Sequence, residues 1–292
     1  MDAQHASLAP ALYFVATPIG SARDITLRAL DILASADVIA AEDTRNTRHL
    51  MEIHGIPVGG RPLIPYHDHN GKAQRPKLIG LIKDGKSVAY VSDAGTPLIA
   101  DPGYALGRAV IDAGLTVTAA PGPSAVLAAL SVSGLPTDRF MFAGFAPPAA
   151  GARLSFLKSL SNTAATVILY ESANRLEKLL GAMAEVMGPD RPAVICRELT
   201  KRFEETRRGT VGSLLEALPE MTLKGEIVVL CGRAPETAPS TQNVEDALRA
   251  ALAGSRLKDA ARDVAEALNL PKREVYQIGL ALKASENPGE NS

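Results

Sequence analysis

ALYFVATPIGSARDITLRALDILASADVIAAED, residues 11–43, decides the fold class of this chain. The apolar runs ALYFVATP and DVIAAED predict strands. ITLRALDILASA, which lies between them, predicts a helix with Leu27, Leu30 and Leu33 on one face. A strand, a helix and a second strand in succession are typical of α/β architecture. The same alternation continues through most of the chain, so we expect an α/β protein.

The pattern also predicts how the chain divides into domains. The alternation restarts near residue 122, and a stretch rich in Pro, Thr, Ser and Asn follows the last predicted strand. Two later helical patterns, joined by the short turn NLP, resemble a helix-turn-helix. Residues 256–283 hold six basic and four acidic residues, so a packing or dimerisation module is as well supported as a nucleic-acid reader. We therefore expect a disordered lead at 1–11, α/β domains at 12–122 and 123–234, a linker at 235–243, a helical module at 244–284 and a disordered tail at 285–292.

The composition excludes several classes of protein. Among 292 residues, 46% are hydrophobic and the net charge is -1, so no global positive field attracts nucleic acid. Cys196 and Cys231 lie in apolar stretches, which favours buried thiols in a reducing cytosol over a disulfide. No apolar run approaches the roughly 20 residues of a spanning helix, and the first ten residues lack the features of a signal peptide. We expect a cytoplasmic protein that does not enter a membrane.

One apparent motif has the wrong context. GLIKDGKS, residues 80–87, fits the phosphate-binding pattern GxxxxGK[ST]. That loop binds phosphate when it follows a strand and opens a helix. Here the predicted helix comes first and the predicted strand second, so Gly85 is better interpreted as a helix C-cap, and the pattern does not indicate a nucleotide hydrolase.

Three loops rich in Gly and Pro follow predicted strands: TPIG at 17–20, SDAGTPLIADPG at 92–103 and PGPSA at 121–125. Ligands of open α/β sheets bind beyond the carboxyl ends of the strands. Gly and Pro keep side chains away and present backbone groups to a ligand. Each loop alone is equally a rigid turn, but three at one kind of position favour a ligand crevice. Because none aligns Lys or Arg, we expect a weakly anionic or zwitterionic ligand.

Further polar clusters follow other predicted strands, and one, YHDHN, lies in a polar loop between two predicted helices. YHDHN supplies His67, Asp68 and His69, but alternate residues of an extended loop point apart, so a polar substrate-facing or solvated loop is favoured over a metal site. RELTKRFEETRRG, residues 197–209, is either a solvated loop or a phosphate-binding patch, because guanidinium groups suit phosphodiesters. AEDTR, at 41–45, and YESANR, at 170–175, place acids and arginines at two more strand ends.

Several motifs, taken in order, closely resemble the ribosomal RNA small-subunit methyltransferase I family, part of the wider class of tetrapyrrole-methylase-like, S-adenosylmethionine-dependent enzymes. They are ATPIGSARDITLRAL, AAEDTRNTRHL, YHDHN, VSDAGTPLIADPG, APGPSAVLAALSVSGLPTDRFMFAGF, YESANRL and RELTKRFEE. The resemblance implies two α/β domains with the methyl donor between them, a small C-terminal helical module and a homodimer. It also implies 2'-O-methylation of a cytidine ribose in the decoding region of 16S ribosomal RNA, as naked RNA or in the assembled small subunit.

The resemblance also assigns site residues. It implies that S-adenosylmethionine is bound by Pro18, Asp93, Gly95, Thr96, Pro97, Ser124, Ala125, Gly225 and Glu226. The chemistry fits, because a cationic sulfonium suits a crevice of backbone groups with an acid better than a basic pocket, and methyl transfer needs no metal.

A ribose hydroxyl needs a base to take its proton, so we expect a Lys of depressed pKa or a carboxylate nearby. The candidates for this catalytic role are Lys201 and Glu171. Residues expected to face or orient the RNA are Glu42, Asp43, Arg45, His67, His69, Arg175 and Arg197. Two alternatives stay open: a small-molecule methylase of tetrapyrrole type, and a non-catalytic RNA-binding assembly factor.

Overall fold

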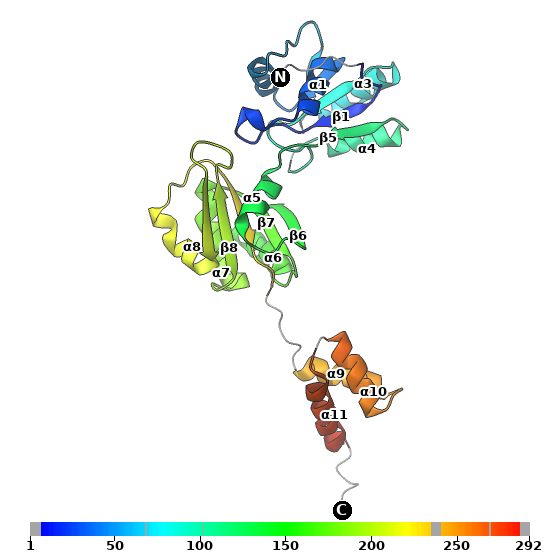
Figure 1. Ribbon diagram of the computed structural model, residues 1–292, viewed down its shortest axis with the longest axis vertical. Helices are drawn as coiled ribbons and strands as arrows, with labels where there is room; N and C mark the ends of the chain where they lie inside the picture. The colour runs from blue at the N-terminus through cyan, green and yellow to red at the C-terminus, as the bar shows by residue number, and fades with distance from the viewer. Residues whose placement is uncertain (1–6, 68, 101, 235–240, 269, 287–292) are drawn as a thin grey trace, which may run out of the picture. The chain divides into compact units, whose positions relative to one another are not determined.

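The computed structural model describes residues 7–67, 69–100, 102–234, 241–268 and 270–286. The chain divides into two compact units, one ending at Arg233 and the other beginning at Ala234. The described residues of the first unit form two five-stranded sheets with helices around them, and those of the second unit form three helices (Figure 1).

The first sheet is parallel and has the strand order β3-β2-β4-β1-β5. Its central strand β1 pairs with β4 on one side and β5 on the other, so that Leu12 aligns with both Val88 and Val117. Parallel strands need crossover connections, which here are mostly helices. The elements of this half are β1 Leu12–Val15, α1 Leu27–Ser35, β2 Val38–Ala41, α2 Thr44–Ile53, β3 Leu63–Pro65, α3 Gly71–Lys83, β4 Val88–Val91, α4 Tyr104–Asp112 and β5 Val117–Ala120, with a short 3-10 helix at Ala22–Asp24.

Helices cover both faces of this sheet. Tyr13 and Val15 pack with residues of α1 and α2 on one face. Leu12 and Phe14 pack with residues of α3 and α4 on the other. Because successive side chains of a strand point to opposite faces, a strand buried on both sides is apolar throughout. This is why ALYFVA reads as a continuous apolar run.

The second sheet is mixed, with the order β6-β7-β10-β8-β9. Only β6 and β7 are parallel, and the remaining neighbours are antiparallel. Its elements are α5 Ala125–Ser133, β6 Phe140–Phe145, α6 Ala150–Leu160, β7 Thr166–Ser172, α7 Leu176–Met187, β8 Pro192–Arg197, β9 Glu205–Thr210, α8 Val211–Ala217 and β10 Glu226–Cys231, with 3-10 helices at Ala173–Arg175 and Leu218–Glu220.

One of the two interpretations of the charged stretch at 197–209 was a solvated loop. The structure shows that the stretch is not a single loop. Its second half belongs to β9, which pairs with β8 so that Cys196 aligns with Thr206. β9 is an edge strand, and charged residues are common on edges because one side remains in water. The residues of β9 therefore have the polarity that is typical of a loop, although their backbone forms a strand.

A shared core joins the two halves of the first unit. Ile19 from the first half packs in one cluster with Val126 of α5, Leu199 and Val228. A hydrogen bond from Ser21 N to Thr200 Oγ1, 3.1 Å long, also connects the halves. The turn after β1 is thus docked against the turn after β8.

Two predictions made from the sequence are confirmed. α3 ends at Lys83 and β4 begins at Val88, so GLIKDGKS joins a helix to a following strand, and Gly85 has a φ of +83°. Cys196 and Cys231 are buried free thiols.

The second unit has its own small core. α9 Thr241–Leu252, α10 Leu257–Ala267 and α11 Lys272–Glu286 bury Val244, Leu248, Val264 and Val275 together. The first helix begins inside the stretch expected as a linker, of which residues 235–240 lie outside the described residues, as do 1–6 of the expected lead and 287–292 of the expected tail. In the parts of the chain that the structure describes, no helix has both the length and the apolarity to cross a bilayer.

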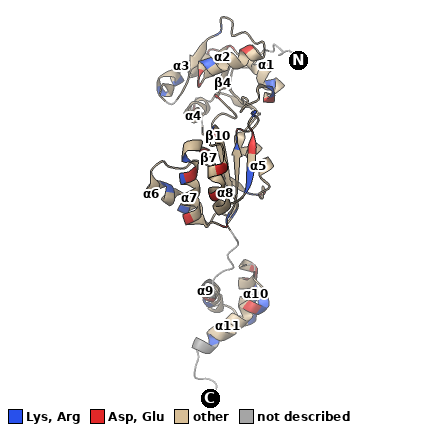
Figure 2. Ribbon diagram, turned by 90° about the vertical axis from the view of Figure 1, so that its left-hand side faces the viewer, with Lys and Arg blue, Asp and Glu red and all other residues tan. Residues whose placement is uncertain are grey.

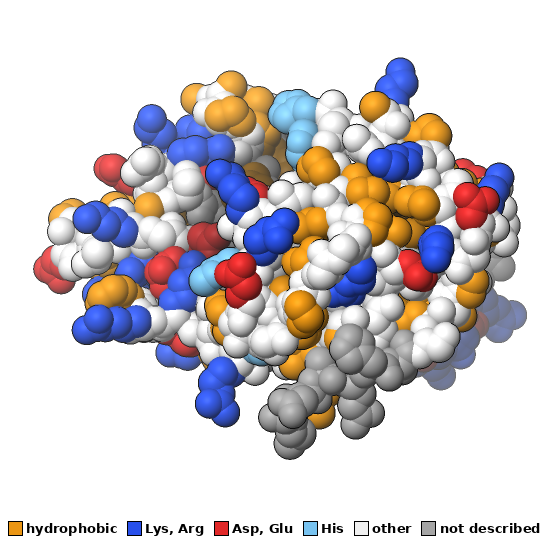
Figure 3. All heavy atoms as spheres, turned by 90° about the horizontal axis from the view of Figure 1, so that it is seen from above, with side chains coloured by type: hydrophobic (Ala, Val, Ile, Leu, Met, Phe, Trp, Pro, Cys, Tyr) orange, Lys and Arg blue, Asp and Glu red, His pale blue; other side chains and the backbone are white. Residues whose placement is uncertain are grey.

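Charges are mixed on both units. Basic and acidic residues alternate along α10 (Figure 2). On the face seen in Figure 3, Lys and Arg side chains lie among acidic and apolar ones and do not form one continuous patch. On this face, recognition of a polyanion would therefore depend on local sites.

Candidate active site

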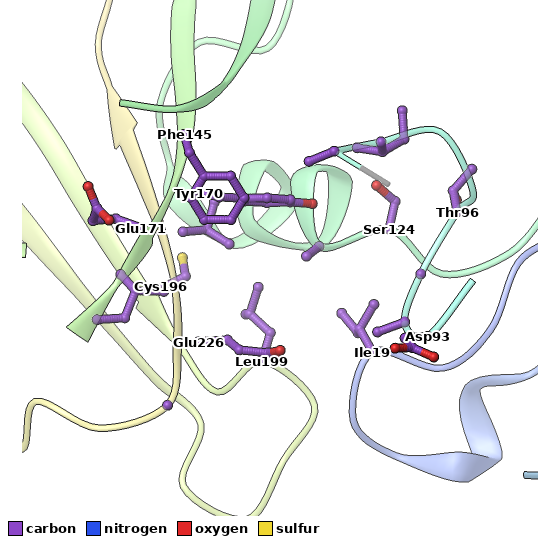
Figure 4. Close-up of a pocket in the computed structure, with 18 of the residues that line it drawn as sticks. Ile19, Asp93, Thr96, Ser124, Phe145, Tyr170, Glu171, Cys196, Leu199 and Glu226 are labelled. Atoms are coloured by element: carbon purple, nitrogen blue, oxygen red, sulfur yellow. The ribbon is translucent and has the colours of Figure 1, made fainter. Parts of the chain in front are cut away.

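A cavity of about 400 Å³ lies between the two sheets of the first unit, beyond the carboxyl ends of the strands of the first sheet. In Figure 4, Ile19, Asp93, Thr96 and Ser124 line one side of it, and Glu171, Cys196, Leu199 and Glu226 lie on the other. The volume falls in the range of about 300–1,000 Å³ that is usual for small-molecule sites.

Acidic groups form part of the rim on the side of the first sheet. Asp43 N donates to Asp93 Oδ1 at 3.1 Å, and Asp93 N donates to Glu42 Oε2 at 3.3 Å. These bonds tie the loop after β2 to the loop after β4. The side-chain hydrogen bond from Arg45 lowers the pKa of Asp43 to about 2, and that guanidinium lies 2.6 Å from the carboxylate.

Backbone contacts shape the glycine-rich loops. Thr17 and Gly95 form an isolated antiparallel bridge, and Thr96 Oγ1 donates to Pro123 O at 2.8 Å. Gly95 has a φ of +80°, and a Cβ there would lie 3.3 Å from the Ile19 side chain. The three predicted loops therefore support one another directly at the cavity, as the strand-end rule implies.

The turn after β8 supplies the opposite rim. Glu198 and Thr200 have φ values of +49° and +63°. Residues other than glycine rarely adopt this left-handed backbone conformation. Strained backbone of this kind concentrates at functional sites. Gly225, with a φ of +89°, lies so close that a Cβ would be 2.3 Å from Glu198 Oε1.

An aromatic and aliphatic wall completes the cavity. Phe145 and Tyr170 have ring centroids 5.6 Å apart, and Tyr170 also packs on Phe142 at 4.7 Å. Leu199 and Ile227 also line the cavity. Sequence reasoning missed this wall, because strand periodicity shows that alternate residues share a face but not which face meets the other domain.

Most predicted donor-binding residues meet at this cavity. Asp93, Gly95, Thr96, Ser124, Ala125, Gly225 and Glu226 all line it. Pro97 is buried beneath the loop and does not line it. Pro18 lines a separate hollow of about 220 Å³ next to α2, which Asp93 also borders.

Lys201 differs from the expected base. Its Nζ lies 3.0 Å from Glu198 Oε1 and 2.8 Å from Glu226 Oε2. Partial burial by itself lowers the pKa of Lys201, but the hydrogen bonds to Glu226 and Glu198 outweigh it, so the pKa is raised and not depressed. A lysine held in this way stays protonated and cannot accept a proton at neutral pH.

The carboxylate of Glu171 does not enter the cavity. On β7 it follows Tyr170, so it points to the opposite face of the sheet, and Figure 4 shows it turned away from the hollow. Its Oε1 accepts from Ser172 N at 2.8 Å and lies 3.1 Å from Arg175 Nε. Arg175 in turn donates to Ala146 O. The ion pair of Glu171 and Arg175 therefore stabilises the end of β7 and does not face a substrate. Glu171 borders the cavity through other atoms of the residue, and Arg175 does not border it.

The remaining residues expected at the RNA are dispersed. Glu42 borders the main cavity, and the Arg45 side chain is 88% exposed. Arg197 is buried and pairs with Glu205 at 3.2 Å, which leaves it unsuited to bind a phosphate. His67 and His69 lie beyond β3 with their rings 5.9 Å apart.

The cavity fits a sulfonium methyl donor. The carboxylates of Asp93 and Glu226 suit a cationic sulfur and an ammonium group, and the wall of Phe145 and Tyr170 offers apolar surface to an adenine ring. Lys201, the basic residue beside this rim, is already paired with two carboxylates.

The two-sheet unit and its cavity define a class of protein. The family description "Tetrapyrrole (Corrin/Porphyrin) Methylases" matches residues 11–215, and "RsmI C-terminal HTH domain" matches residues 238–283. A solved structure of uroporphyrin-III C-methyl transferase from Thermus thermophilus, complexed with S-adenyl homocysteine, superposes with a TM-score of 0.53 at 15% identity, covering 77% of this chain and 98% of that one. The fold of the first unit is thus that of the tetrapyrrole methylases.

Curated relatives define the family within this class. The ribosomal RNA small subunit methyltransferase I of Mesorhizobium japonicum is 47% identical over 97% of this chain and 96% of its own length. The protein of the same name from Synechocystis is 42% identical over 94% of this chain and 98% of its own length. This chain belongs to the ribosomal RNA small subunit methyltransferase I family.

Proposed function

We propose that this protein transfers a methyl group from S-adenosylmethionine to the 2'-hydroxyl of a cytidine ribose in the decoding region of 16S ribosomal RNA, and that it acts in the cytoplasm. The observation that carries the proposal is the single cavity in which the strand-end loops of the first sheet meet the Gly225–Glu226 rim of the second. The near full-length likeness to small-subunit ribosomal RNA methyltransferases supports the choice of substrate.

The residues at the cavity divide into two roles. Gly95, Thr96, Ser124 and Ala125 would hold the donor through backbone and hydroxyl groups, with the apolar wall beside its adenine. S-adenosylmethionine supplies an electrophilic methyl group and needs no metal. The chain contributes alignment of the ribose hydroxyl, exclusion of water and a group that accepts the hydroxyl proton.

A carboxylate on the rim of the cavity is the best candidate for this proton acceptor, because Lys201 is protonated and the Glu171 carboxylate points away from the cavity. Asp93 and Glu226 border the cavity from its two sides, and Glu42, which also borders it, accepts a hydrogen bond from Asp93 N. Asp93→Asn and Glu226→Gln should each be measured for donor affinity by calorimetry and for single-turnover methyl transfer. The variant that loses transfer by about a hundredfold while keeping donor affinity identifies the base. If neither loses transfer, proton removal does not depend on these groups.

Two measurements test the function as a whole. Calorimetry with S-adenosylmethionine should show one site per chain, and mass mapping of ribosomal RNA from a deletion strain should show one cytidine without its ribose methyl group. Binding without a lost ribosomal methyl group would leave a small-molecule methylase as the function. RNA binding without donor binding would support a non-catalytic assembly factor.

We also propose that the protein is a homodimer that joins through β6 and α5. β6 is an edge strand, and Phe140 and Met141 on it are 45% and 41% exposed. Leu127 on α5 is 52% exposed as well. An exposed apolar edge is a pairing site, and a second copy would cover it. Phe140→Glu with Met141→Glu should give a folded monomer in light scattering, whereas Leu280→Glu on α11 should not change the mass.

A further inference from the structure

A second hollow, of about 250 Å³, lies at the same edge of the first sheet. Its lining includes Tyr66 and His67 after β3, Gly71 and Arg75 on α3, and Gly103 and Tyr104 at the start of α4. β3 is separated from β4, whose end carries Asp93, only by β2. With strands about 4.8 Å apart, β3 lies roughly 10 Å from β4 across the sheet.

Flat rings surround this hollow. Tyr104 lines the hollow and is 72% exposed, so its ring is accessible to a ligand. His67 Nδ1 is buried and has no hydrogen-bond partner among the described residues, so a polar group in the hollow could satisfy it. The ring of His69 lies edge to face with that of His67. Such rings accept the face of a nucleic-acid base.

Positive charge lies beside the rings. Arg75 Nε donates to Tyr66 Oη at 3.4 Å, which directs the guanidinium along the wall of the hollow. α3 carries Lys72, Arg75, Lys77 and Lys83 and no acidic residue. None of these forms an ion pair within the described ranges, which omit the sequence neighbours Asp68 and Asp101.

We infer that this hollow binds one nucleotide of the RNA that flanks the methylated cytidine, with its base against Tyr104 and its phosphate at Arg75. The inference rests on the proposed function, since the flanking nucleotide belongs to the same substrate. It explains why YHDHN, which does not reach the main cavity, lies on the active edge of the sheet.

Steady-state kinetics on small ribosomal subunits that lack the methyl group, with labelled S-adenosylmethionine, test the inference. Tyr104→Ala should raise KM for the subunit about tenfold, and Tyr104→Phe should restore it, because stacking needs the ring and not the hydroxyl. Donor affinity and the melting temperature should stay unchanged in both. Lys83→Ala, on α3 about 12 Å further along the helix than Arg75, is the control and should behave as wild type.

Salt dependence separates the phosphate contact from stacking. In filter binding of 16S ribosomal RNA, Arg75→Ala should reduce the slope of log Kd against log salt by about 0.7–0.9, because one phosphate contact is lost. Arg75→Lys should keep the slope, and Tyr104→Ala should leave it unchanged.

The outcomes are distinguishable. If wild type transfers no methyl group to the subunits, the proposed function fails and the inference with it. If wild type is active but the Tyr104→Ala and Arg75→Ala variants match Lys83→Ala in KM and slope, only the inference is overturned. A loss of donor affinity in these variants would also overturn it, since the hollow would then belong to the donor site.

Discussion

Gly225 meets two separate requirements at one residue. Its φ of +89° excludes most side chains, and the Glu198 carboxylate occupies the space that a Cβ would need. That carboxylate accepts hydrogen bonds from Glu226 N and from Lys201 Nζ, both at 3.0 Å. One glycine therefore allows the turn after β8 and the start of β10 to close the rim of the cavity.

Gly225→Ala should weaken donor binding at least tenfold, because the added methyl group displaces the Glu198 side chain from the rim. The measurement is the calorimetric Kd for S-adenosylmethionine. Gly188→Ala is the control, since Gly188 has a similar φ of +91° but nothing within 4 Å of a Cβ. It should cost about 1 kcal/mol of stability and leave the Kd unchanged. Equal effects of the two variants on the Kd would contradict the role of the Glu198 contact.

Glu198 should also make stability depend on pH. The hydrogen bond from the Glu226 backbone, and then that from Lys201, lower the pKa of Glu198 below its usual 4.5. The unfolded chain therefore binds this proton more readily, so the stabilisation is fully present above about pH 4.5 and is lost as the pH falls through the folded pKa. Urea unfolding between about pH 6 and pH 3 should show a smaller loss of free energy for Glu198→Gln than for wild type. Glu185→Gln, at an exposed position on α7, should keep the loss seen in wild type.

At the scale of elements, the end of α1 depends on a distant side chain. Arg61 Nη1 donates to Leu33 O at 2.6 Å and to Ala36 O at 3.1 Å, and Nη2 donates to Pro57 O at 2.7 Å. The carbonyls of Leu33 and Ala36 stand at the C-terminal end of α1, where carbonyls have no partner within the helix, so the guanidinium both satisfies them and offsets the helix dipole.

Arg61→Ala should lower the free energy of unfolding by about 3 kcal/mol, because buried carbonyls lose charged donors. Arg61→Lys should recover only part of this, since an ammonium lacks the planar fork. Urea denaturation measures both. Arg108→Ala removes an exposed pair with Asp112 and should cost less than about 0.5 kcal/mol. A comparable cost at both positions would contradict the capping role of Arg61.

The elements differ in how far the sequence predicted them. Four strands of the first sheet, such as Val88–Val91, are apolar runs that were recognisable alone, whereas the three-residue strand β3, Leu63–Pro65, was not predicted. β9 was not, because its pairing with β8 decides its structure while its residues have the polarity of a loop. The donor loops followed from the rule for strand ends. The direction of Glu171 and the wall of Tyr170 did not, because they depend on which face of the second sheet meets the first domain.

At the scale of the whole molecule, the two units have separate cores. The residues of the helical core all lie between Val244 and Leu282, and those that line the main cavity all lie before residue 229. Each unit therefore buries its own apolar surface, as independently folding domains do.

A chain ending at Arg233 should stay folded and bind S-adenosylmethionine with unchanged affinity. If the helical module contributes to RNA binding, as a helix-turn-helix does, the shortened chain should bind 16S ribosomal RNA more weakly. Calorimetry and filter binding measure the two affinities. Loss of donor affinity on truncation would show that the first unit depends on the second.

The contact of Gly20 with the turn after β8 has a consequence for how ligands enter and leave. A Cβ at Gly20 would lie 2.5 Å from Lys201 Cγ and 2.6 Å from Thr200 Oγ1, so the two halves touch there without a gap. The unusual φ values of Glu198 and Thr200 belong to this docked turn. Parting the halves would break the Ser21–Thr200 hydrogen bond but would also let those two residues relax. If the halves part during ligand exchange, we therefore expect the rate of product release to respond to substitutions in this turn, far from the transferred methyl group.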